Sequence, residues 1–203
     1  ENWSMEINFS ALLLAAGFLS RMAQPKLLLP WGSTTVIGQI LSTLAEAGMQ
    51  EVLVVTGAER QQIEQQVAKL AGIFPVRAIY NHGFEDEGML SSIQTGLAAL
   101  GTQTSAALIA LGDQPLIRKE TIQSICTAFI QNQSPLVIPS YQHRRGHPWL
   151  VAPSLWPEML ALSSSTTARQ FLNTHAGLVE FVAADESILK DLDTPEEYTR
   201  QRP

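Results

Sequence analysis

The sequence has very little cysteine, and this limits the chemistry it can support. Cys126 is the only cysteine among 203 residues, so no disulfide can form within the chain. It lies in Thr121–Ile130, where apolar residues follow helical spacing, and free cysteines in such stretches are usually buried. We therefore interpret Cys126 as a small core residue rather than a nucleophile.

Positive charge is also scarce. The chain carries 13 Lys and Arg against 19 Asp and Glu, which gives a formal net charge of −6 at pH 7. A protein that binds nucleic acid normally has a basic surplus, so we exclude that class of protein. A small phosphorylated ligand remains compatible with this balance, because a few local cations and a metal ion are enough to hold it.

Long apolar runs are absent. A membrane-spanning helix needs about 20 mostly apolar residues in succession, and no stretch approaches that length, so we expect no membrane association. The first residues, Glu1–Glu6, lack the basic segment and apolar core of a signal peptide. We therefore expect a cytoplasmic location.

What the sequence does contain suits a globular protein. It is 45% hydrophobic and 16% charged, which is ordinary for a protein with a substantial core. A chain of this length buries roughly 70% of the surface that it exposes when unfolded, so it needs no disulfide or structural metal. We expect residues 1–203 to form one domain.

Short runs that are apolar on both faces alternate with amphipathic stretches. The runs that we expect to form strands are Ser10–Ala16, Glu51–Thr56, Pro75–Tyr80 and Ala106–Leu111. Such runs suit a parallel sheet that helices cover on both faces. Between them, Val36–Leu44 and Ile63–Leu70 repeat apolar residues at helical spacing, and a glycine follows each. The alternation predicts a layered α/β fold with a mainly parallel sheet.

The last third of the chain is less regular. We expect strands at Leu136–Ile138, Trp149–Val151 and Leu178–Val182, a polar loop at Pro139–Arg145, and short helices within 153–162 and 167–174. In open α/β sheets, ligands bind at the carboxyl ends of the strands. This rule directs attention to the loops after Ala16, Tyr80 and Leu111.

The first of these loops combines small residues with two cations. The strand ends in Leu14-Ala15-Ala16-Gly17, where small side chains let the backbone approach a ligand closely. Arg21 and Lys26 follow, and they either clamp a polyphosphate or are solvated cations of a tight turn. The loop is not a Walker motif, which closes with Gly-Lys-Ser/Thr, and it lacks the Gly-x-Gly-x-x-Gly of dinucleotide-binding folds.

Motif order along the whole chain is more specific than this loop. The segments concerned are Leu14–Gly17, Arg21-Met22, Pro25–Leu29, Gly88–Leu97, Leu111–Pro115, Gly146–Pro148 and Asp191–Tyr198. Each is a weak signal alone, but together and in this order they resemble the MobA-like nucleotidyltransferases. The closest resemblance is to the MocA-like branch, the molybdenum cofactor cytidylyltransferases, because the guanylyltransferase branch has Leu-Ala-Gly-Gly at its first loop.

The resemblance implies both a fold and a reaction. The fold would be the three-layer α/β/α, Rossmann-like arrangement of nucleotide-diphospho-sugar transferases, with a nucleotide-binding half at about 9–115 and an acceptor-binding half at about 116–203. The reaction would be Mg²⁺-dependent transfer of CMP from CTP to the phosphate of molybdopterin or the molybdenum cofactor. Its products would be molybdopterin cytosine dinucleotide and pyrophosphate, and a target molybdoenzyme would be a transient partner.

Other functions remain open from the sequence. GTP could be the nucleotide substrate, or a sugar phosphate the acceptor. In a different class, the chain would be a carrier that delivers the molybdenum cofactor to an enzyme of the xanthine dehydrogenase type, with little or no catalysis.

The resemblance also assigns roles to residues. Arg21, Lys26 and Asp113 would be catalytic. The nucleotide-binding set would be Leu14, Ala15, Ala16, Gly17, Arg21, Lys26, Ser91, Ser92, Gly112 and Asp113. Mg²⁺ would bind Asp113 and Asp193, because hard cations prefer oxygen ligands, and Asp191 would be either a further ligand or a capping carboxylate. From the residues alone, Asp113 could equally be a turn residue, and Ser91 and Ser92 could cap a helix.

Acceptor binding would fall to the cation-rich segment around Gly146-His147-Pro148. His147, Arg144 and Arg145 would hold the anionic pterin phosphate, although a lone histidine is also a common structural hydrogen-bonding group. The chain departs from the family pattern at Leu19, where a small polar residue is common, and at Ala23, where glycine is usual. Both departures touch the triphosphate loop, so they bear on turnover rather than on the fold.

Overall fold

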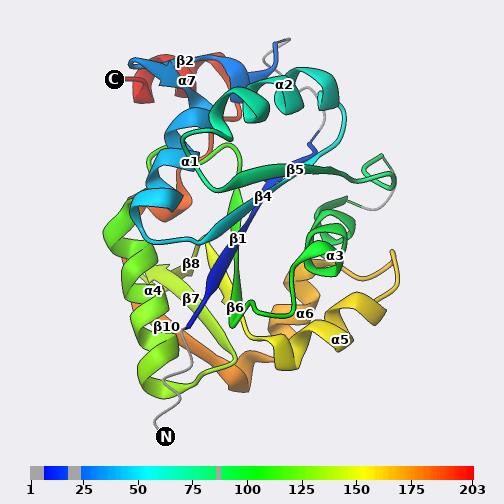
Figure 1. Ribbon diagram of the computed structural model, residues 1–203. Coiled ribbons are helices and arrows are strands. Elements are labelled where there is room, and N and C mark those ends of the chain that lie inside the picture. Colours follow the sequence, from blue (N-terminus) through cyan, green and yellow to red (C-terminus); the bar gives the residue numbers. More distant parts are fainter. Residues whose placement is uncertain (1–6, 18–23, 86–87) are drawn as a thin grey trace, which may run out of the picture.

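One sheet runs through the middle of the molecule (Figure 1). The computed structural model describes residues 7–17, 24–85 and 88–203. Within them an 8-stranded sheet has the order β10-β7-β9-β6-β1-β4-β5, with β8 paired to β7. Its strands are β1 (Phe9–Ala15), β4 (Glu51–Thr56), β5 (Val76–Tyr80), β6 (Ala106–Leu111), β7 (Leu136–Tyr141), β8 (Arg144–Arg145), β9 (Trp149–Val151) and β10 (Val179–Ala183).

The sheet is mainly parallel, as the sequence predicts. β1 pairs in parallel with β4 and with β6, β4 with β5, and β7 with β10. β9 is antiparallel to both β6 and β7, so these two strands run in the same direction. The carboxyl ends of β1, β4, β5, β6 and β7 therefore lie at one edge of the sheet, where this class of fold binds ligands.

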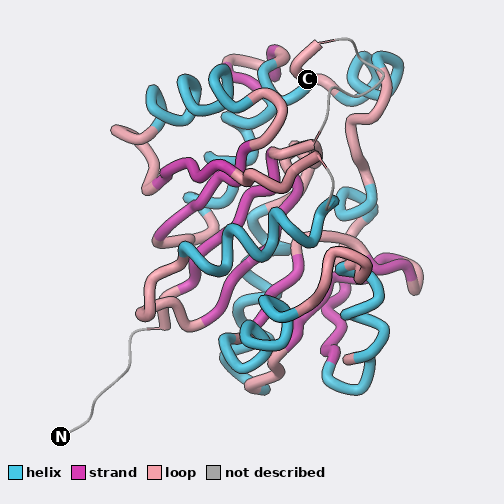
Figure 2. The backbone as a smooth tube through the Cα atoms, turned by 90° about the vertical axis from the view of Figure 1, so that its right-hand side faces the viewer, coloured by secondary structure: helices cyan, strands magenta, loops and turns pink. Residues whose placement is uncertain are grey.

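Helices cover both faces of the sheet, which gives the three layers that the resemblance implies (Figure 2). One face packs against α1 (Val36–Glu46), α2 (Arg60–Leu70) and α4 (Lys119–Asn132), and the other against α3 (Gly88–Ala99), α5 (Trp156–Ala161) and α6 (Ala168–Thr174). Successive residues of β1 point to opposite faces. Leu13 belongs to the first core and Leu12 to the second, and both are fully buried.

The C-terminal segment returns to the elements that follow the first loop. These are the 3₁₀ turn η1 (Lys26–Leu28) and a separate hairpin of β2 (Pro30–Trp31) and β3 (Thr34–Thr35). The last helix, α7 (Pro195–Gln201), lies beside this hairpin (Figure 1). Tyr198 donates a hydrogen bond from its hydroxyl to the carbonyl of Pro30, and its ring lies 6.3 Å from that of Trp31.

One local prediction is wrong. Pro139–Arg145 is not a loop, because β7 continues to Tyr141 and turns back through Gln142 and His143 at φ 49° and 64° to pair with β8. The prediction gave weight to the polar composition, whereas cross-strand pairing decides the structure here. The alternative that Ser91 and Ser92 cap a helix does not hold, because α3 already begins at Gly88.

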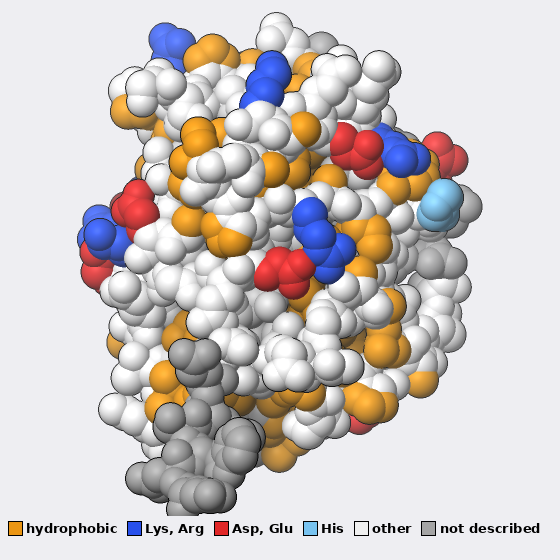
Figure 3. All heavy atoms as spheres, in the orientation of Figure 1, with side chains coloured by type: hydrophobic (Ala, Val, Ile, Leu, Met, Phe, Trp, Pro, Cys, Tyr) orange, Lys and Arg blue, Asp and Glu red, His pale blue; other side chains and the backbone are white. Residues whose placement is uncertain are grey.

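Helix length and the distribution of surface charge complete the description of the fold. No helix in the described ranges is long and apolar enough to cross a membrane. Lys and Arg side chains are scattered over the face seen in Figure 3 and lie near acidic ones, instead of gathering into a broad basic area.

Candidate active site

A cavity of about 330 Å³ opens at the carboxyl ends of β1 and β6. Its lining comes from segments far apart in the sequence: Leu14, Ala15, Ala16, Gly17, Lys26, Leu27, Glu59, Phe84, Glu85, Gly88, Met89, Ser92, Leu111 and Asp113. Leu14–Gly17, Lys26, Ser92 and Asp113 were predicted as site residues, and they meet here. The volume suits a ligand of nucleotide size.

Close backbone packing brings the first loop and the Asp113 turn together. The amide of Gly112 donates to the carbonyl of Leu14 over 3.0 Å. A Cβ at position 112 would lie 2.9 Å from that carbonyl oxygen and 3.1 Å from Leu27, so only glycine fits without a shift. Gly112 itself does not line the cavity; its role is to let Asp113 lie beside the first loop.

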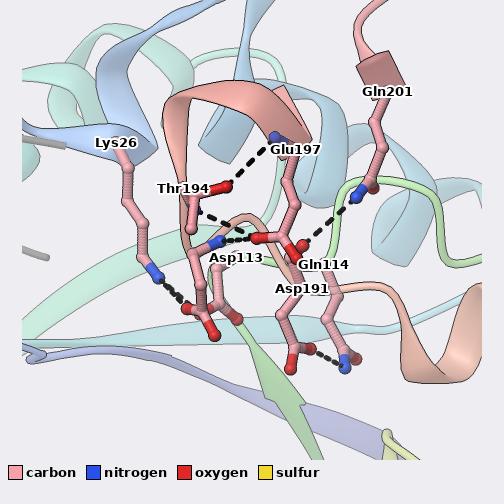
Figure 4. A network of polar contacts seen from close by, with 8 residues as sticks. Lys26, Asp113, Gln114, Asp191, Thr194, Glu197 and Gln201 are labelled. Carbon is pink, nitrogen blue, oxygen red and sulfur yellow. Dashed lines mark hydrogen bonds and ion pairs between the residues drawn. The ribbon is translucent and has the colours of Figure 1, made fainter. Parts of the chain in front are cut away.

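Lys26 joins two carboxylates that are far apart in the sequence (Figure 4). Its Nζ lies 2.7 Å from Oδ2 of Asp113 and 3.2 Å from Oδ1 of Asp193. Burial alone would lower the pKa of Lys26, but the charges and hydrogen bonds of Asp113 and Asp193 outweigh it and raise that pKa. Lys26 is therefore a charged ammonium group that donates hydrogen bonds to both carboxylates.

Gln114 ties the Asp113 turn to the C-terminal acidic segment. Its side-chain amide donates to Oδ1 of Asp191 over 2.7 Å and more weakly to the carbonyl of Ile188 over 3.4 Å. The amide of Leu192 donates to the carbonyl of Asp113 over 3.0 Å. Burial raises the pKa of Asp191 and the nearby charges of Asp113 and Asp193 add to the rise, while the Gln114 hydrogen bond opposes it. The acidic segment is thus held against the sheet edge rather than free in solvent.

A capping box fixes the backbone that carries Asp193. Thr194 accepts a hydrogen bond from the amide of Glu197, and the Glu197 carboxylate accepts from the amides of Asp193 and Thr194 over 2.9 and 3.0 Å (Figure 4). Gln201 donates to the carbonyl of Asp191 over 3.3 Å. The helix α7, which follows Asp193, also contacts the β2–β3 hairpin, which follows the η1 turn that begins at Lys26.

A divalent cation fits the pair Asp113 and Asp193. No group of three or more His, Cys, Asp or Glu side chains within the described ranges is arranged to hold a metal ion. Mg²⁺, however, typically uses one or two carboxylates and completes its shell with water and substrate phosphates. The ammonium of Lys26 already occupies a cation position between these two carboxylates, and this supports the fit.

The two serines differ in position, and the residue that orients them was missed by the sequence analysis. Asn81, buried directly after β5, donates to the hydroxyls of Ser91 over 2.8 Å and Ser92 over 3.1 Å. Ser92 lines the cavity, whereas Ser91 does not and also contacts the carbonyl of Gly88. The sequence rule directed attention to the loop after Tyr80, but nothing in that loop singled out Asn81.

The proposed acceptor residues lie outside the cavity. The ring of His147 stacks on Trp149 at 4.2 Å, and its Nε2 is buried with no hydrogen-bond partner among the described residues. Burial lowers the pKa of His147 to about 4, so it is neutral at pH 7. Arg145 donates to Asn173 over 3.2 Å, and Arg144 is exposed. Arg21, Leu19 and Ala23 lie outside the described residues.

The layered sheet, the cavity at its carboxyl edge and the Lys26–Asp113–Asp193 cluster define a nucleotidyltransferase of the nucleotide-sugar transferase-like fold. The chain belongs to the MobA-like NTP transferase family, whose domain model matches residues 11–179. This confirms the family, the fold and the enzyme class that the sequence predicts.

Relatives with different activities share this framework. The chain is 33% identical to nicotine blue oxidoreductase of Paenarthrobacter nicotinovorans, an alignment that covers 94% of this chain and 95% of that protein. It is 28% identical to the molybdenum cofactor cytidylyltransferase of Escherichia coli, with 92% of each chain covered.

The fold also matches solved structures. The crystal structure of Rv0371c from Mycobacterium tuberculosis superposes with a TM-score of 0.81 at 24% identity, covering 95% of this chain and 97% of that one. The manganese complex of the same protein gives a TM-score of 0.77. At this level of identity, the likeness establishes the fold alone.

Proposed function

We propose that this enzyme transfers CMP from CTP to the phosphate of molybdopterin or the molybdenum cofactor, giving molybdopterin cytosine dinucleotide and pyrophosphate. The observation that carries the proposal is the Lys26–Asp113–Asp193 cluster, which borders a cavity walled by Leu14–Gly17. The cytidylyltransferase relative, which aligns over nearly its whole length, supports this choice of reaction.

The chemistry needs positioning and charge more than proton transfer. A phosphate oxygen of the acceptor attacks the α-phosphorus of CTP, the bond from that phosphorus to the bridging oxygen breaks, and pyrophosphate leaves. The acceptor phosphate is already ionised at pH 7, so no general base is required. Lys26, together with Arg21, would hold the triphosphate and stabilise the charge that develops on its oxygens.

Asp113 and Asp193 would hold Mg²⁺, which when bound neutralises charge on the triphosphate. The manganese complex of the Rv0371c protein supports a divalent cation in this fold. A cation at these oxygens would compete with the Lys26 ammonium, which now contacts both of them. Lys26 would then be free to bind phosphate.

We assign acceptor binding to the second half of the chain. In this proposal residues 1–203 act as one domain, with the nucleotide in the half at about 9–115 and the acceptor against the half at about 116–203. Arg144 and Arg145 pair with the last two residues of β7, at the same edge of the sheet as Asp113, and this supports a role toward an anionic acceptor. The neutral His147 could contribute only a hydrogen bond, not a charge.

The test is thermal stability with CTP, GTP, ATP and UTP, each with and without Mg²⁺. A nucleotide at about 100 times its Kd adds about 2.7 kcal/mol to the free energy of unfolding, enough for a shift of a few degrees. We expect the largest Mg²⁺-dependent shift with CTP, followed by pyrophosphate release when molybdopterin is added. The Asp113→Asn variant should keep its fold and lose about 100-fold or more in turnover.

Each other outcome identifies a different function. A shift with GTP alone would replace cytidylyl by guanylyl transfer, and tight pterin binding without pyrophosphate release would indicate a cofactor carrier. Because one relative at 33% identity is named an oxidoreductase, the thermal-stability test also includes a reduced nicotinamide dinucleotide as a ligand. Stabilisation by that compound and by none of the triphosphates would contradict the proposal.

A further inference from the structure

Glu59 lines the cavity, and its carboxylate has no role in the function proposed above. It follows the carboxyl end of β4, is half-buried, and lines the same cavity as Gly17, Lys26 and Asp113. In the part of the chain that the structure describes, its carboxylate has no hydrogen bond and no ion pair. A carboxylate that is partly removed from water without a partner is a candidate for ligand binding.

Among the residues that the structure describes, Glu59 has neither of the structural roles expected of a glutamate at the start of a helix, which are capping the helix and pairing with a nearby cation. Glu59 is the N-cap residue of α2, but its side chain makes no capping hydrogen bond. Thr35, Thr167 and Thr194 do cap their helices with their side chains. The adjacent Arg60 pairs with Glu64 over 2.9 Å instead of with Glu59. The Glu59 carboxylate is therefore available to the cavity.

Close packing at Gly57 fixes the loop that carries Glu59. A Cβ on Gly57 would lie 2.4 Å from the carbonyl oxygen of Ala16 and 2.8 Å from its Cα, so the exit of β4 rests directly on the first loop. Glu59 is thereby held beside the Ala15–Gly17 wall of the cavity. Its position depends on backbone contact rather than on a flexible arm.

The charge of the Glu59 carboxylate limits which part of a nucleotide it can bind. Burial raises the pKa of Glu59, and the charge of Lys26 opposes that rise, so the two side chains lie within electrostatic reach of each other. A carboxylate repels phosphates, so it needs a ligand group that donates hydrogen bonds. In a nucleotide bound with its phosphates at Lys26, the group next to the phosphates is the ribose, and it carries two such donors.

We propose that Glu59 is a nucleotide-binding residue whose carboxylate accepts hydrogen bonds from the 2′- and 3′-hydroxyls of the ribose. The inference rests on the proposed function in requiring a nucleoside triphosphate in this cavity, but not on which base it carries. Selection against a missing hydroxyl is strong when a buried acceptor is left without its donor. Glu59 would thus make the enzyme select ribonucleotides over deoxyribonucleotides.

The test compares the affinities of CTP, 2′-deoxy-CTP and 3′-deoxy-CTP by titration calorimetry with Mg²⁺ present. We expect the wild-type protein to bind CTP about 10-fold or more tightly than either deoxy compound. Glu59→Ala should bind CTP about as weakly as the wild-type protein binds 2′-deoxy-CTP, so that the preference disappears. Glu59→Gln keeps one oxygen acceptor and should retain part of the preference.

The control is Glu120→Gln on the exposed first turn of α4, which should behave as the wild-type protein does. An unchanged preference in Glu59→Ala would overturn the assignment, as would a wild-type protein that binds CTP and 2′-deoxy-CTP equally well. The comparison of CTP with 2′-deoxy-CTP uses the wild-type protein alone, so a folding defect in a variant cannot affect it. If the wild-type protein binds no triphosphate at all, the proposed function itself fails. A ribose preference with GTP instead of CTP would keep the role of Glu59 and change only the base.

Discussion

At the scale of single residues, the site depends on side chains that contact other site residues rather than a substrate. Gln114 is the clearest example, because it is only 4% exposed and donates to Asp191, which the sequence analysis left without a definite role. The motif that contains it was recognised, yet only Gly112 and Asp113 received a role, and Gln114 did not. The buried Gln114 amide contacts the Asp191 carboxylate from the turn that carries Asp113, which we propose as a metal ligand. Supporting contacts of this kind around metal sites commonly affect metal affinity about 10- to 100-fold.

We predict that Gln114→Leu raises the Mg²⁺ concentration needed for half-maximal turnover by about 10-fold. The substitution leaves the half-buried Asp191 carboxylate without its donor, so the free energy of unfolding should also fall by about 1–3 kcal/mol. Metal titration of activity, with urea unfolding in parallel, measures both effects. Gln123→Leu, at an exposed position of α4, is the matched control. A loss of stability with unchanged metal dependence would show that Gln114 is structural only.

At the scale of elements, tight contact between a hairpin and a 3₁₀ turn positions the acidic segment. Gly146 follows β8 and packs against η4 (Glu186–Leu189), the turn that leads into Asp191. A Cβ at position 146 would lie 2.4 Å from the carbonyl oxygen of Ile188 and 2.7 Å from its Cβ. The amide of His147 also donates to the Ile188 carbonyl over 3.4 Å. The Gly-His-Pro motif therefore supports the placement of Asp191 and Asp193 through the backbone.

Gly146→Ala should lower the free energy of unfolding by about 1–3 kcal/mol, because backbone atoms must move to make room. Moving η4 should also reduce turnover at saturating nucleotide, since Asp191 and Asp193 follow it. Urea midpoints and steady-state rates measure the two effects. Gly101→Ala serves as the control, because a Cβ there meets nothing within 4 Å. Equal stability of the two variants would contradict the packing argument.

At the scale of the whole molecule, buried groups make stability depend on pH. His147 is stacked on Trp149 with its Nε2 buried, and burial lowers its pKa to about 4 from the ordinary 6.5. Below pH 6.5 the imidazole of His147 binds a proton in the unfolded chain, whereas in the folded chain it remains neutral down to about pH 4. The contribution of His147 is thus fully present above pH 6.5 and is lost as the pH falls toward 4.

We predict that this histidine alone reduces the free energy of unfolding by up to about 3 kcal/mol between pH 6.5 and 4. His147→Gln should remove that part of the pH dependence. Asp191 acts in the opposite direction, because its raised pKa makes the folded state bind a proton more tightly in acid. It is present in both proteins, so the difference between their stability curves isolates His147. Parallel curves would contradict the assignment of a buried neutral imidazole.

Much of the fold could be predicted because it follows from local pattern. The runs at 51–56 and 106–111 form strands with the predicted bounds, and that at 10–16 is shifted by one residue. Fully buried strands must be apolar on both faces, so the signal is in the composition itself. The β7–β8 hairpin was missed because its polar residues pair across strands that no local pattern identifies.

The sequence by itself determined the family, the layered α/β fold and the residue types available for binding phosphate and metal, because periodicity and motif order are properties of the chain. Only the tertiary structure decided which of these groups meet. Lys26, Asp113 and Asp193 are distant in sequence and join in one cluster. In the sequence, Glu59 resembles an ordinary residue at a helix start, but packing brings it to the cavity. Asn81 resembles an ordinary loop residue, but packing brings it to Ser92. Such contacts depend on how the strands pair and on where a glycine lets two backbone segments pack closely. No local stretch of the sequence specifies which segments will meet in this way.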